Sequence, residues 1–306
     1  MDLLFLGTPA FSLAPLEKLH QRHKIMAVIT QPERPRGRNL KLQPSPVKKW
    51  AEEAKIPVLE PARVNDEDVV NKIRQMAPEA IVMAAYGQIL SADLLKVPKY
   101  GCINIHASFL PALRGAAPIQ RAIMDGLRKT GVTIMKMDEG MDTGVILDQA
   151  EIAIEVNDDS GTLSGKIAAL GADLIDKVLD GLADGNILEK PQANDDATFS
   201  PPIKKEELRI DWRKSAPELV NQIRALQPAP GAFTIWRDKR LKIGGAEAME
   251  MGKADPGVTI VENDQLLVGT GLGVLKISEV QPAGKKNMPT EQFIRGYRPR
   301  GGEIMG

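Results

Sequence analysis

The sequence is poor in the residue types that build disulfides and metal centres. Its 306 residues include one cysteine, Cys102, and three histidines, His20, His23 and His106. A single cysteine excludes an intrachain disulfide and a cysteine-based metal cluster. No second histidine or cysteine stands at the spacing of a metal-binding motif, so no metal site is expected. Cys102 lies in an apolar run and is expected to be a small buried side chain.

Long apolar runs and an excess of one charge are also missing. No stretch approaches the roughly 20 apolar residues that cross a bilayer. The apolar run at 3–6 is too short for a secretory signal, so we expect a cytoplasmic protein that does not bind membranes. Lysine plus arginine and aspartate plus glutamate each number 40. Residues 208–306 hold 15 basic and 11 acidic side chains, and this excess is too small to identify a polyanionic partner.

Short apolar runs alternate with helical patterns through the first half of the chain. Strands are expected at 3–6, 25–30, 57–59, 80–84, 101–105, 131–137 and 145–154. Helices are expected at 11–20, 47–54, 66–76, 91–95, 118–125 and 160–182, the last with apolar residues three and four apart. Such alternation predicts an α/β fold with a Rossmann-like, mostly parallel sheet covered on both faces. Ligands of these sheets bind beyond the carboxyl ends of the strands.

The pattern changes after Gly185. A polar segment with three prolines at 191, 201 and 202 indicates a linker. One helix is expected at 216–226, followed by strands at 233–236, 241–244, 258–262, 266–269 and 274–280. Short strands separated by turns predict a small antiparallel β-barrel of the oligonucleotide-binding (OB-like) type. We therefore divide the chain into a catalytic domain (1–188), a linker (189–207) and a C-terminal barrel (208–306).

Two polar side chains lie at the end of the apolar strand at 101–105. Residues two apart in a strand face the same way, so Asn104 and His106 are expected to project together. An amide and an imidazole directed at one point suit a developing oxyanion. Polar residues at a strand end also satisfy loop backbone groups, and the pair alone does not separate these two roles.

A carboxylate on a glycine-flanked loop supplies a candidate partner for this imidazole. The sequence G-M-D-T-G at 140–144 carries Asp142 after the strand at 131–137. A carboxylate beside an imidazole fixes its tautomer and favours its charged form. An aspartate between glycines also commonly caps a turn. His20 and His23 are expected at an exposed helix end, which leaves His106 as the candidate catalytic imidazole.

The sequence resembles the methionyl-tRNA formyltransferases, a family of folate-dependent formyltransferases, over nearly its whole length. The matching segments of the first half are G-T-P at 7–9, T-Q-P-E-R-P-R-G-R at 30–38, P-S-P-V-K at 44–48, A-A-Y-G at 84–87, G-C-I-N-I-H at 101–106 and R-G-A-A-P-I-Q-R at 114–121. They continue with G-V-T-I-M at 131–135, M-D-T-G at 141–144, S-G-T-L at 160–163, D-W at 211–212 and Q-P-A-G-K-K at 281–286. The combination is specific, although no single segment is.

The resemblance implies a reaction and the residues that perform it. The family's catalytic trio corresponds to Asn104, His106 and Asp142. Its folate-contacting segment, usually S-L-L-P, corresponds to Ser108, Phe109, Leu110 and Pro111. The loop that lines its pterin pocket corresponds to Tyr86, Gly87, Gln88, Ile89 and Leu90. The implied activity is transfer of the formyl group of 10-formyltetrahydrofolate to the amino group of initiator methionyl-tRNA, by a monomeric enzyme that needs no metal.

A basic, proline-rich loop is expected at 31–49. It holds one acidic residue, Glu33, and six basic ones, Arg34, Arg36, Arg38, Lys41, Lys48 and Lys49. Its four prolines argue against regular structure, and loops of this length are usually functional or disordered. In the resembling family this loop grips the tRNA acceptor end, with Arg38 as the best match to its key arginine and Arg36 and Lys41 beside it. Phosphate contacts suit such a loop.

Other functions remain open at this stage. Glycinamide ribonucleotide formyltransferases share the trio but lack an appended barrel, and sugar-nucleotide formyltransferases usually depart from the motif at 114–121. A folate hydrolase would leave the basic loop unexplained. An RNA-binding module without catalysis predicts an incomplete trio. In the second half, Arg237, Lys239, Arg240 and Lys242 alternate with apolar residues on a candidate hairpin, as a solvated face or an RNA contact.

Overall fold

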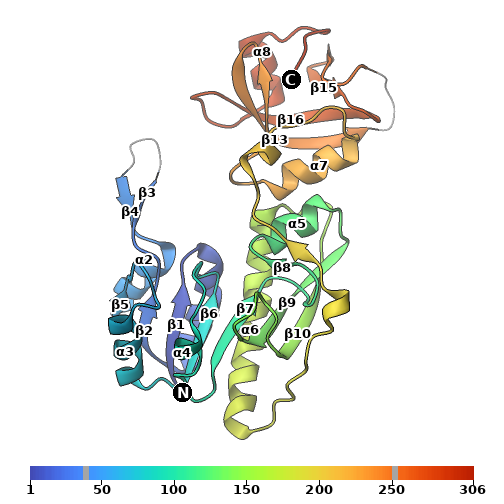
Figure 1. The fold of residues 1–306 in the computed structure, drawn as a ribbon. Coiled ribbons are helices and arrows are strands. Elements are labelled where there is room, and N and C mark those ends of the chain that lie inside the picture. The colour runs from blue at the N-terminus through green and yellow to red at the C-terminus, as the bar shows by residue number, and fades with distance from the viewer. Residues whose placement is uncertain (37–40, 250–253) are drawn as a thin grey trace. The chain divides into compact units, whose positions relative to one another are not determined.

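A computed structural model describes residues 1–36, 41–249 and 254–306. The chain forms two compact units. The N-terminal unit contains residues 1–118, 129–153 and 164–200, and the C-terminal unit contains 119–128, 154–163 and 201–306. Each unit is drawn in Figure 1 and described by itself below.

The N-terminal unit is built on a seven-stranded sheet within the described residues, as Figure 1 shows. Its strands in spatial order are β10 (Ile146–Ala153), β9 (Lys129–Lys136), β7 (Cys102–His106), β6 (Ala80–Ala84), β1 (Asp2–Gly7), β2 (Lys24–Ile29) and β5 (Val58–Leu59). The five strands from β7 to β5 are parallel, whereas β9 and β10 are antiparallel to their neighbours. The predicted α/β class with a mostly parallel sheet is confirmed.

Helices cover the sheet because its strands are apolar on both faces. They are α1 (Leu13–Arg22, after the 3-10 turn Ala10–Ser12), α2 (Pro46–Glu53), α3 (Glu67–Met76), α4 (Ala92–Leu95) and the part of α6 (Ser160–Asp184) from Ser164 onwards. The helix α5 (Pro118–Met124) belongs, apart from Pro118, to the C-terminal unit. Residues of α3 and α4 pack with Leu4, Ile29 and Ile81 in one buried cluster. Gly171 lets α6 approach the sheet closely, because a Cβ there would lie 2.8 Å from Ile105 Cγ2. None of the described helices combines the length and apolar character that crossing a bilayer requires.

The basic segment at 31–49 contains regular structure, contrary to the sequence-based expectation. Strands β3 (Arg34–Arg36) and β4 (Lys41–Gln43) pair as an antiparallel hairpin. Pro35 fits there because a two-stranded ribbon consists of edge strands, where a missing N–H group is tolerated. Ser45 then caps α2 by accepting a hydrogen bond from Lys48 N at 3.0 Å, and Pro46 begins that helix.

The segment expected to begin a linker is ordered against the N-terminal unit up to Ser200. Lys190 pairs with Ile146 through an isolated bridge. A 3-10 turn follows at Asn194–Asp196. The strand β11 (Phe199–Ser200) then pairs in parallel with β8 (Arg114–Gly115), which follows β7. Residues 189–200 are termed the strap below, because the segment returns to the loops around His106.

The C-terminal unit is an antiparallel β-structure with two flanking helices. Its strands in spatial order are β12 (Phe233–Trp236), β13 (Lys239–Met249), β16 (Val274–Pro282), β15 (Gln265–Gly269) and β14 (Thr259–Glu262), with β17 (Met288–Pro289) paired to β16. The predicted small barrel-type domain is confirmed. Helix α7 (Ala216–Ala225) buries Leu219 and Ile223 in the core. Helix α8 (Thr290–Tyr297), which the sequence analysis missed, adds Phe293 beside Trp236.

Candidate active site

Strand β7 brings Asn104 and His106 to the same face of the sheet. Asn104 pairs with Met83 of β6 and Met135 of β9, and His106 pairs with Thr133 of β9. Both side chains are 6% exposed. Within the described part of the chain, the Asn104 side-chain amide has no hydrogen-bond partner. Its polar atoms are not among the fully buried ones that lack a partner, so solvent or a ligand can reach this amide.

Both ring nitrogens of His106 face acceptors. Nε2 lies 3.1 Å from the Leu113 carbonyl oxygen, and Nδ1 lies 3.6 Å from Asp142 Oδ1. A carbonyl oxygen can only accept, so Nε2 carries a proton. The contact between Nδ1 and the Asp142 carboxylate is longer than a hydrogen bond. The structure thus places the imidazole and the carboxylate in the arrangement that the sequence analysis expected.

Asp142 reaches His106 by a different route from the one that a parallel sheet implies. Because β9 runs antiparallel to β7, the loop after β9 starts beside Cys102, where Met137 N donates to the Cys102 carbonyl at 2.8 Å. The loop folds back so that Asp142 lies at the His106 end of β7. There Asp142 Oδ2 accepts a hydrogen bond from Gly115 N at 2.8 Å. One carboxylate oxygen is therefore fixed by backbone and the other faces the imidazole.

The two glycines of the loop at 140–144 are required by space. A Cβ on Gly140 would lie 2.0 Å from Thr143 Oγ1, and one on Gly144 would lie 1.9 Å from the Lys136 carbonyl oxygen. Asp138 Oδ1 accepts hydrogen bonds from Gly140 N at 3.0 Å and Thr143 Oγ1 at 2.7 Å. Asp142 itself has a φ of 54°, a left-handed conformation that is uncommon outside glycine. The loop is tightly turned so that it presents this one carboxylate.

The segment at 108–111 is held by two side chains that the sequence analysis missed. Thr133 Oγ1 donates to the Ser108 carbonyl at 2.7 Å and accepts from Leu110 N at 3.0 Å. Gln149 Nε2 donates to the Leu110 carbonyl at 2.7 Å. Phe109, expected to replace a leucine of the family, is 37% exposed. Thr133 lies on β9 and Gln149 lies on β10. In the sequence, neither residue differs from an ordinary strand residue.

The loop at 86–90 has some side chains buried in the core and others exposed at the surface. The Tyr86 side chain is buried in the core, and its burial raises the pKa of its hydroxyl to about 12. Its carbonyl accepts from Thr8 Oγ1 at 3.2 Å and from Gln31 Nε2 at 3.3 Å. Gln88 Oε1 accepts from Val64 N at 2.8 Å. Gly87 has a φ of 88°, Leu90 is buried, and Ile89 is 82% exposed.

The basic residues expected at the tRNA loop can be placed only in part. Arg38 lies outside the described residues. Arg36 and Lys41 lie in β3 and β4, where the backbone alone is described. Lys48 has a structural role, because its Nζ lies 2.7 Å from both Glu33 Oε1 and Glu60 Oε2. The hydrogen bond to Glu33, followed by that to Glu60, raises the pKa of Lys48.

The strap contributes hydrogen bonds to the loops around His106 that the sequence analysis did not predict. Arg114 is 4% exposed and its Nη2 donates to Gln192 Oε1 at 2.7 Å and to Asn194 Oδ1 at 3.0 Å. Gln192 Nε2 donates to the carbonyls of Asp142 at 2.9 Å and Gly144 at 2.7 Å. Ser200 Oγ donates to the Leu113 carbonyl at 3.0 Å. A polar segment between prolines carries no pattern that predicts these contacts.

The other histidines and possible metal ligands lie apart from this arrangement. His20 is exposed, as expected. The expectation that His23 is exposed is wrong: its side chain is 7% exposed and its Nε2 lies 3.5 Å from Asp176 Oδ1 of α6. Burial, followed by the nearby N-terminal amine, lowers the pKa of His23. The described residues hold no cluster of three or more histidine, cysteine, aspartate or glutamate side chains suited to a metal ion.

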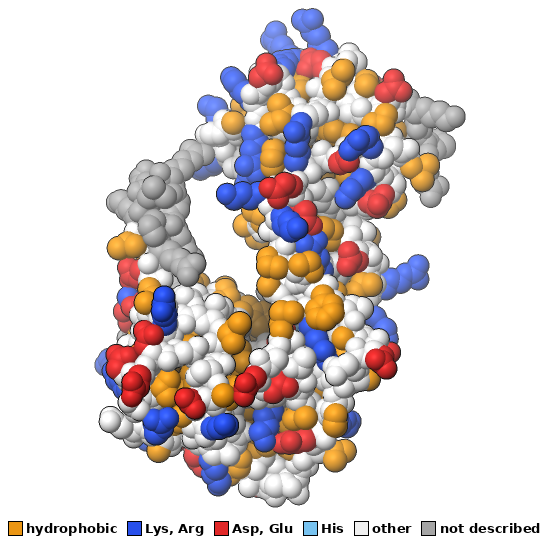
Figure 2. Space-filling view, viewed as in Figure 1, with side chains coloured by type: hydrophobic (Ala, Val, Ile, Leu, Met, Phe, Trp, Pro, Cys, Tyr) orange, Lys and Arg blue, Asp and Glu red, His pale blue; other side chains and the backbone are white. Residues whose placement is uncertain are grey.

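Basic side chains are conspicuous on the visible face of the C-terminal unit in Figure 2. On the β12–β13 hairpin, the Arg237 guanidinium lies 4.1 Å from the Trp236 ring centroid and pairs with Glu303 at 2.6 Å. The Arg240 guanidinium lies 3.7 Å from the Phe233 ring centroid. Lys242 Nζ donates to the Pro230 carbonyl at 2.7 Å. These three side chains are held in place by the protein itself.

Comparison with known proteins agrees with this fold. The model of the formyl transferase family matches residues 1–179, and the model of the formyl transferase C-terminal domain matches residues 202–298. Methionyl-tRNA formyltransferase of Carboxydothermus hydrogenoformans is 45% identical over 305 residues, which cover 99% of each chain. Methionyl-tRNA formyltransferase of Bacillus licheniformis is 44% identical over 99% of this chain and 98% of that protein.

Solved structures with lower identity share the fold. WlaRD, a sugar 3N-formyl transferase solved with dTDP and 5-N-formyl-THF, has a TM-score of 0.67 at 19% identity and covers 94% of this chain and 99% of its own. HypX from Aquifex aeolicus, solved with tetrahydrofolic acid, has a TM-score of 0.67 at 17% identity and covers 95% of this chain and 46% of its own. The full-length identity to the two enzymes above is what decides the family. This chain belongs to the methionyl-tRNA formyltransferases.

Proposed function

We propose that this protein transfers the formyl group of 10-formyltetrahydrofolate to the amino group of methionyl-initiator tRNA. The observation that carries the proposal is 45% identity over both units to an enzyme with that name. The sugar N-formyl transferase WlaRD shares the fold at 19% identity, so a sugar nucleotide is the weaker candidate for the formyl acceptor. A soluble, cytoplasmic and monomeric enzyme is the form that we expect.

The proposed chemistry needs a donor for an oxyanion and a route for one proton. The amine attacks the formyl carbon, and the carbonyl oxygen becomes negatively charged. The carbon–nitrogen bond to the folate then breaks, and the proton lost by the amine moves to the departing folate nitrogen. Asn104, whose amide has no partner among the described residues, would donate to the oxyanion. No metal is required for this sequence of steps.

His106 would donate to the same oxyanion or carry the proton. Its Nε2 donates to the Leu113 carbonyl, so a turn towards substrate removes that hydrogen bond. The Leu113 carbonyl also accepts from Ser200 Oγ at 3.0 Å, and it therefore keeps a donor when the imidazole turns. Asp142, which faces Nδ1, would orient the ring. The Ser200 hydrogen bond thus allows His106 to adopt either orientation without leaving the Leu113 carbonyl unpaired.

Substrate binding is assigned to three surfaces. The segment 108–111, organised by Thr133 and Gln149, would contact the folate. Backbone groups of residues 86–90 would read the edge of the pterin. Arg36, Arg38 and Lys41 would contact phosphates of the tRNA.

A direct assay tests this function. The protein is mixed with 10-formyltetrahydrofolate and methionyl-initiator tRNA, and formylmethionine is measured after hydrolysis of the ester. Elongator methionyl-tRNA, glycinamide ribonucleotide and a dTDP-linked amino sugar serve as competing acceptors. We expect rapid formylation of the initiator tRNA and slow reaction with the other three. Preference for the amino sugar or the ribonucleotide would overturn the proposed substrate.

A further inference from the structure

We infer that Gln192 is a positioning residue that sets the place of the Asp142 carboxylate during formyl transfer. The inference rests on the proposed function, in which Asp142 holds His106. Gln192 lies in the strap, and its side-chain amide bonds Arg114 of β8 through the oxygen and the loop at 140–144 through the nitrogen.

The two ends of this amide have separate partners. Nε2 donates to the carbonyls of Asp142 at 2.9 Å and Gly144 at 2.7 Å, on either side of Thr143. Oε1 accepts from Arg114 Nε at 3.1 Å and Nη2 at 2.7 Å. All four hydrogen-bonding positions of the amide are used. The loop that carries Asp142 is thereby joined to Arg114. The next residue, Gly115, donates its own N–H to the Asp142 carboxylate.

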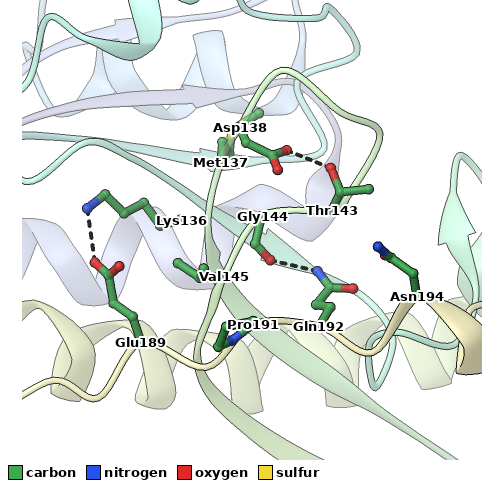
Figure 3. A pocket seen from close by; sticks show the side chains of 10 residues that line it. All are labelled: Lys136, Met137, Asp138, Thr143, Gly144, Val145, Glu189, Pro191, Gln192 and Asn194. Atoms are coloured by element: carbon green, nitrogen blue, oxygen red, sulfur yellow. Dashed lines mark hydrogen bonds and ion pairs between the residues drawn. The ribbon is translucent and has the colours of Figure 1, made fainter.

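The loop packs closely on one side, where Gly144 lies against the Lys136 carbonyl, and is open on the other. An open pocket of about 470 Å³ lies there, as Figure 3 shows, and its lining includes Thr143, Gly144, Gln192 and Asn194. Figure 3 also shows the Gln192 amide directed at the Gly144 carbonyl, whereas Asp138 pairs with Thr143 at the far side of the loop. On the open side, hydrogen bonds from Gln192 restrain the loop at Asp142 and Gly144.

Small displacements of this loop should change the rate of formyl transfer. Asp142 Oδ1 lies 3.6 Å from His106 Nδ1, so a shift of the loop changes the orientation of the imidazole. A misplacement of about 1 Å in a catalytic group can cost on the order of 10²-fold in rate. Gln192 contacts neither His106 nor Asn104, and its effect is expected on the chemical step and not on substrate affinity.

Two substitutions of Gln192 and one control separate this role from simple support of the strap. Gln192→Glu keeps an acceptor for Arg114 but cannot donate to the loop carbonyls. Gln192→Met has similar size, no charge and no hydrogen bonds. Asn194→Ala removes an acceptor of Arg114 without touching the loop. Formylation of methionyl-tRNA is measured at saturating folate, with the enzyme concentration set by the stoichiometry of folate binding and with the Tm recorded for each variant.

We expect kcat to fall about 10- to 100-fold in both Gln192 variants, with both KM values within about 2-fold of the native enzyme. Asn194→Ala should keep kcat within about 2-fold. Native kcat per folate site in either Gln192 variant, a fall in Gln192→Glu alone, or an equal fall in Asn194→Ala would overturn the inference. A native enzyme that does not formylate methionyl-tRNA would instead refute the proposed function.

Discussion

The backbone amide of Gly115 donates to Asp142 Oδ2 at 2.8 Å and so joins the segment after β7 to the loop after β9. Both segments contribute to the site, and neither is adjacent to the other in the sequence. Because Oδ2 is held by this amide, Oδ1 is the oxygen that faces His106 Nδ1 at 3.6 Å. The orientation of the His106 imidazole therefore depends on two separate loops.

Removal of either proposed oxyanion donor should slow the reaction. We expect Asn104→Ala and His106→Ala each to lower kcat by on the order of 10²–10³, because one hydrogen bond to the developing charge is lost. His20→Ala, which changes an exposed histidine of α1, should have the native rate. Steady-state kinetics with methionyl-tRNA check this. Formylation at the native rate by one of the first two variants would refute the role assigned to that residue.

Thr133→Val tests the support of the folate segment. The substitution removes a buried hydroxyl that holds Ser108 and Leu110 and replaces it with a methyl group of similar size. We expect a loss of about 1–3 kcal/mol in the free energy of unfolding, because the Leu110 N–H loses its acceptor. The KM for the formylfolate should rise while the KM for tRNA stays unchanged.

Thr130→Val, at a buried hydroxyl without a hydrogen-bond partner among the described residues, is the matched control. Equal folate KM values in the two variants would contradict this assignment.

Two glycine substitutions should have opposite effects on stability. Gly144→Ala would place a Cβ 1.9 Å from the Lys136 carbonyl oxygen, and we expect a loss of about 1–3 kcal/mol together with reduced kcat. Gly165→Ala lies in α6 with nothing within 4 Å of the new Cβ. It should stabilise the protein by about 0.5–1 kcal/mol, because alanine favours the helix. Denaturant unfolding measures both changes, and a stable, active Gly144→Ala enzyme would show that the loop tolerates displacement.

The Arg121–Glu207 ion pair should make stability depend on acidic pH. Arg121 Nη2 lies 3.0 Å from Glu207 Oε2, and this hydrogen bond is the main cause that lowers the pKa of Glu207 from 4.5 to about 2. Because the folded-state pKa is the lower one, the contribution is complete above pH 4.5 and is lost as the pH falls towards 2. We expect Glu207→Gln to cost about 1 kcal/mol at neutral pH, since the pair is partly exposed, and nothing near pH 2.

Unfolding free energies at several pH values, with Glu206→Gln as the exposed control, measure this dependence. The native protein and Glu207→Gln should converge as the pH falls. A difference between them that stays constant down to acid pH would show that the ion pair does not cause it.

Arg38→Ala tests the proposed tRNA contact of the hairpin segment. The KM for tRNA should rise, and the slope of log affinity against log salt should shrink by about 1, because one phosphate contact is lost. Lys177→Ala, at an exposed lysine of α6, should change neither quantity. Unchanged tRNA affinity and salt dependence in Arg38→Ala would remove Arg38 from the interface.

Much of the fold follows from sequence periodicity, because buried strands and amphipathic helices leave apolar patterns along the chain. The strand at 80–84 and the helix at 216–226 were predicted in this way. The direction of β9 was not predicted, because a strand buried between neighbours has the same composition in either direction. Helix α8 is short and follows several strands, so its apolar pattern was not recognised.

The site itself was predicted through family motifs and not through chemistry alone. Asn104 and His106 are two apart on one strand, which the pattern reveals, and Asp142 was assigned from the M-D-T-G motif. Gln192, Thr133 and Gln149 could not be predicted, because their roles depend on partners 16 to 78 residues away in the sequence. The buried position of His23 likewise depends on Asp176, a residue of a distant helix.

The β8–β11 pairing has a practical consequence for dissecting the enzyme. Phe199 and Ser200 pair with Arg114 and Gly115, so the first unit recruits residues that follow the long helix α6. A gene fragment that stops at residue 188 would encode a protein without Gln192, Thr198 and Ser200. Fragments intended for isolated folate-binding measurements should therefore extend at least to Ser200, so that they keep the strap.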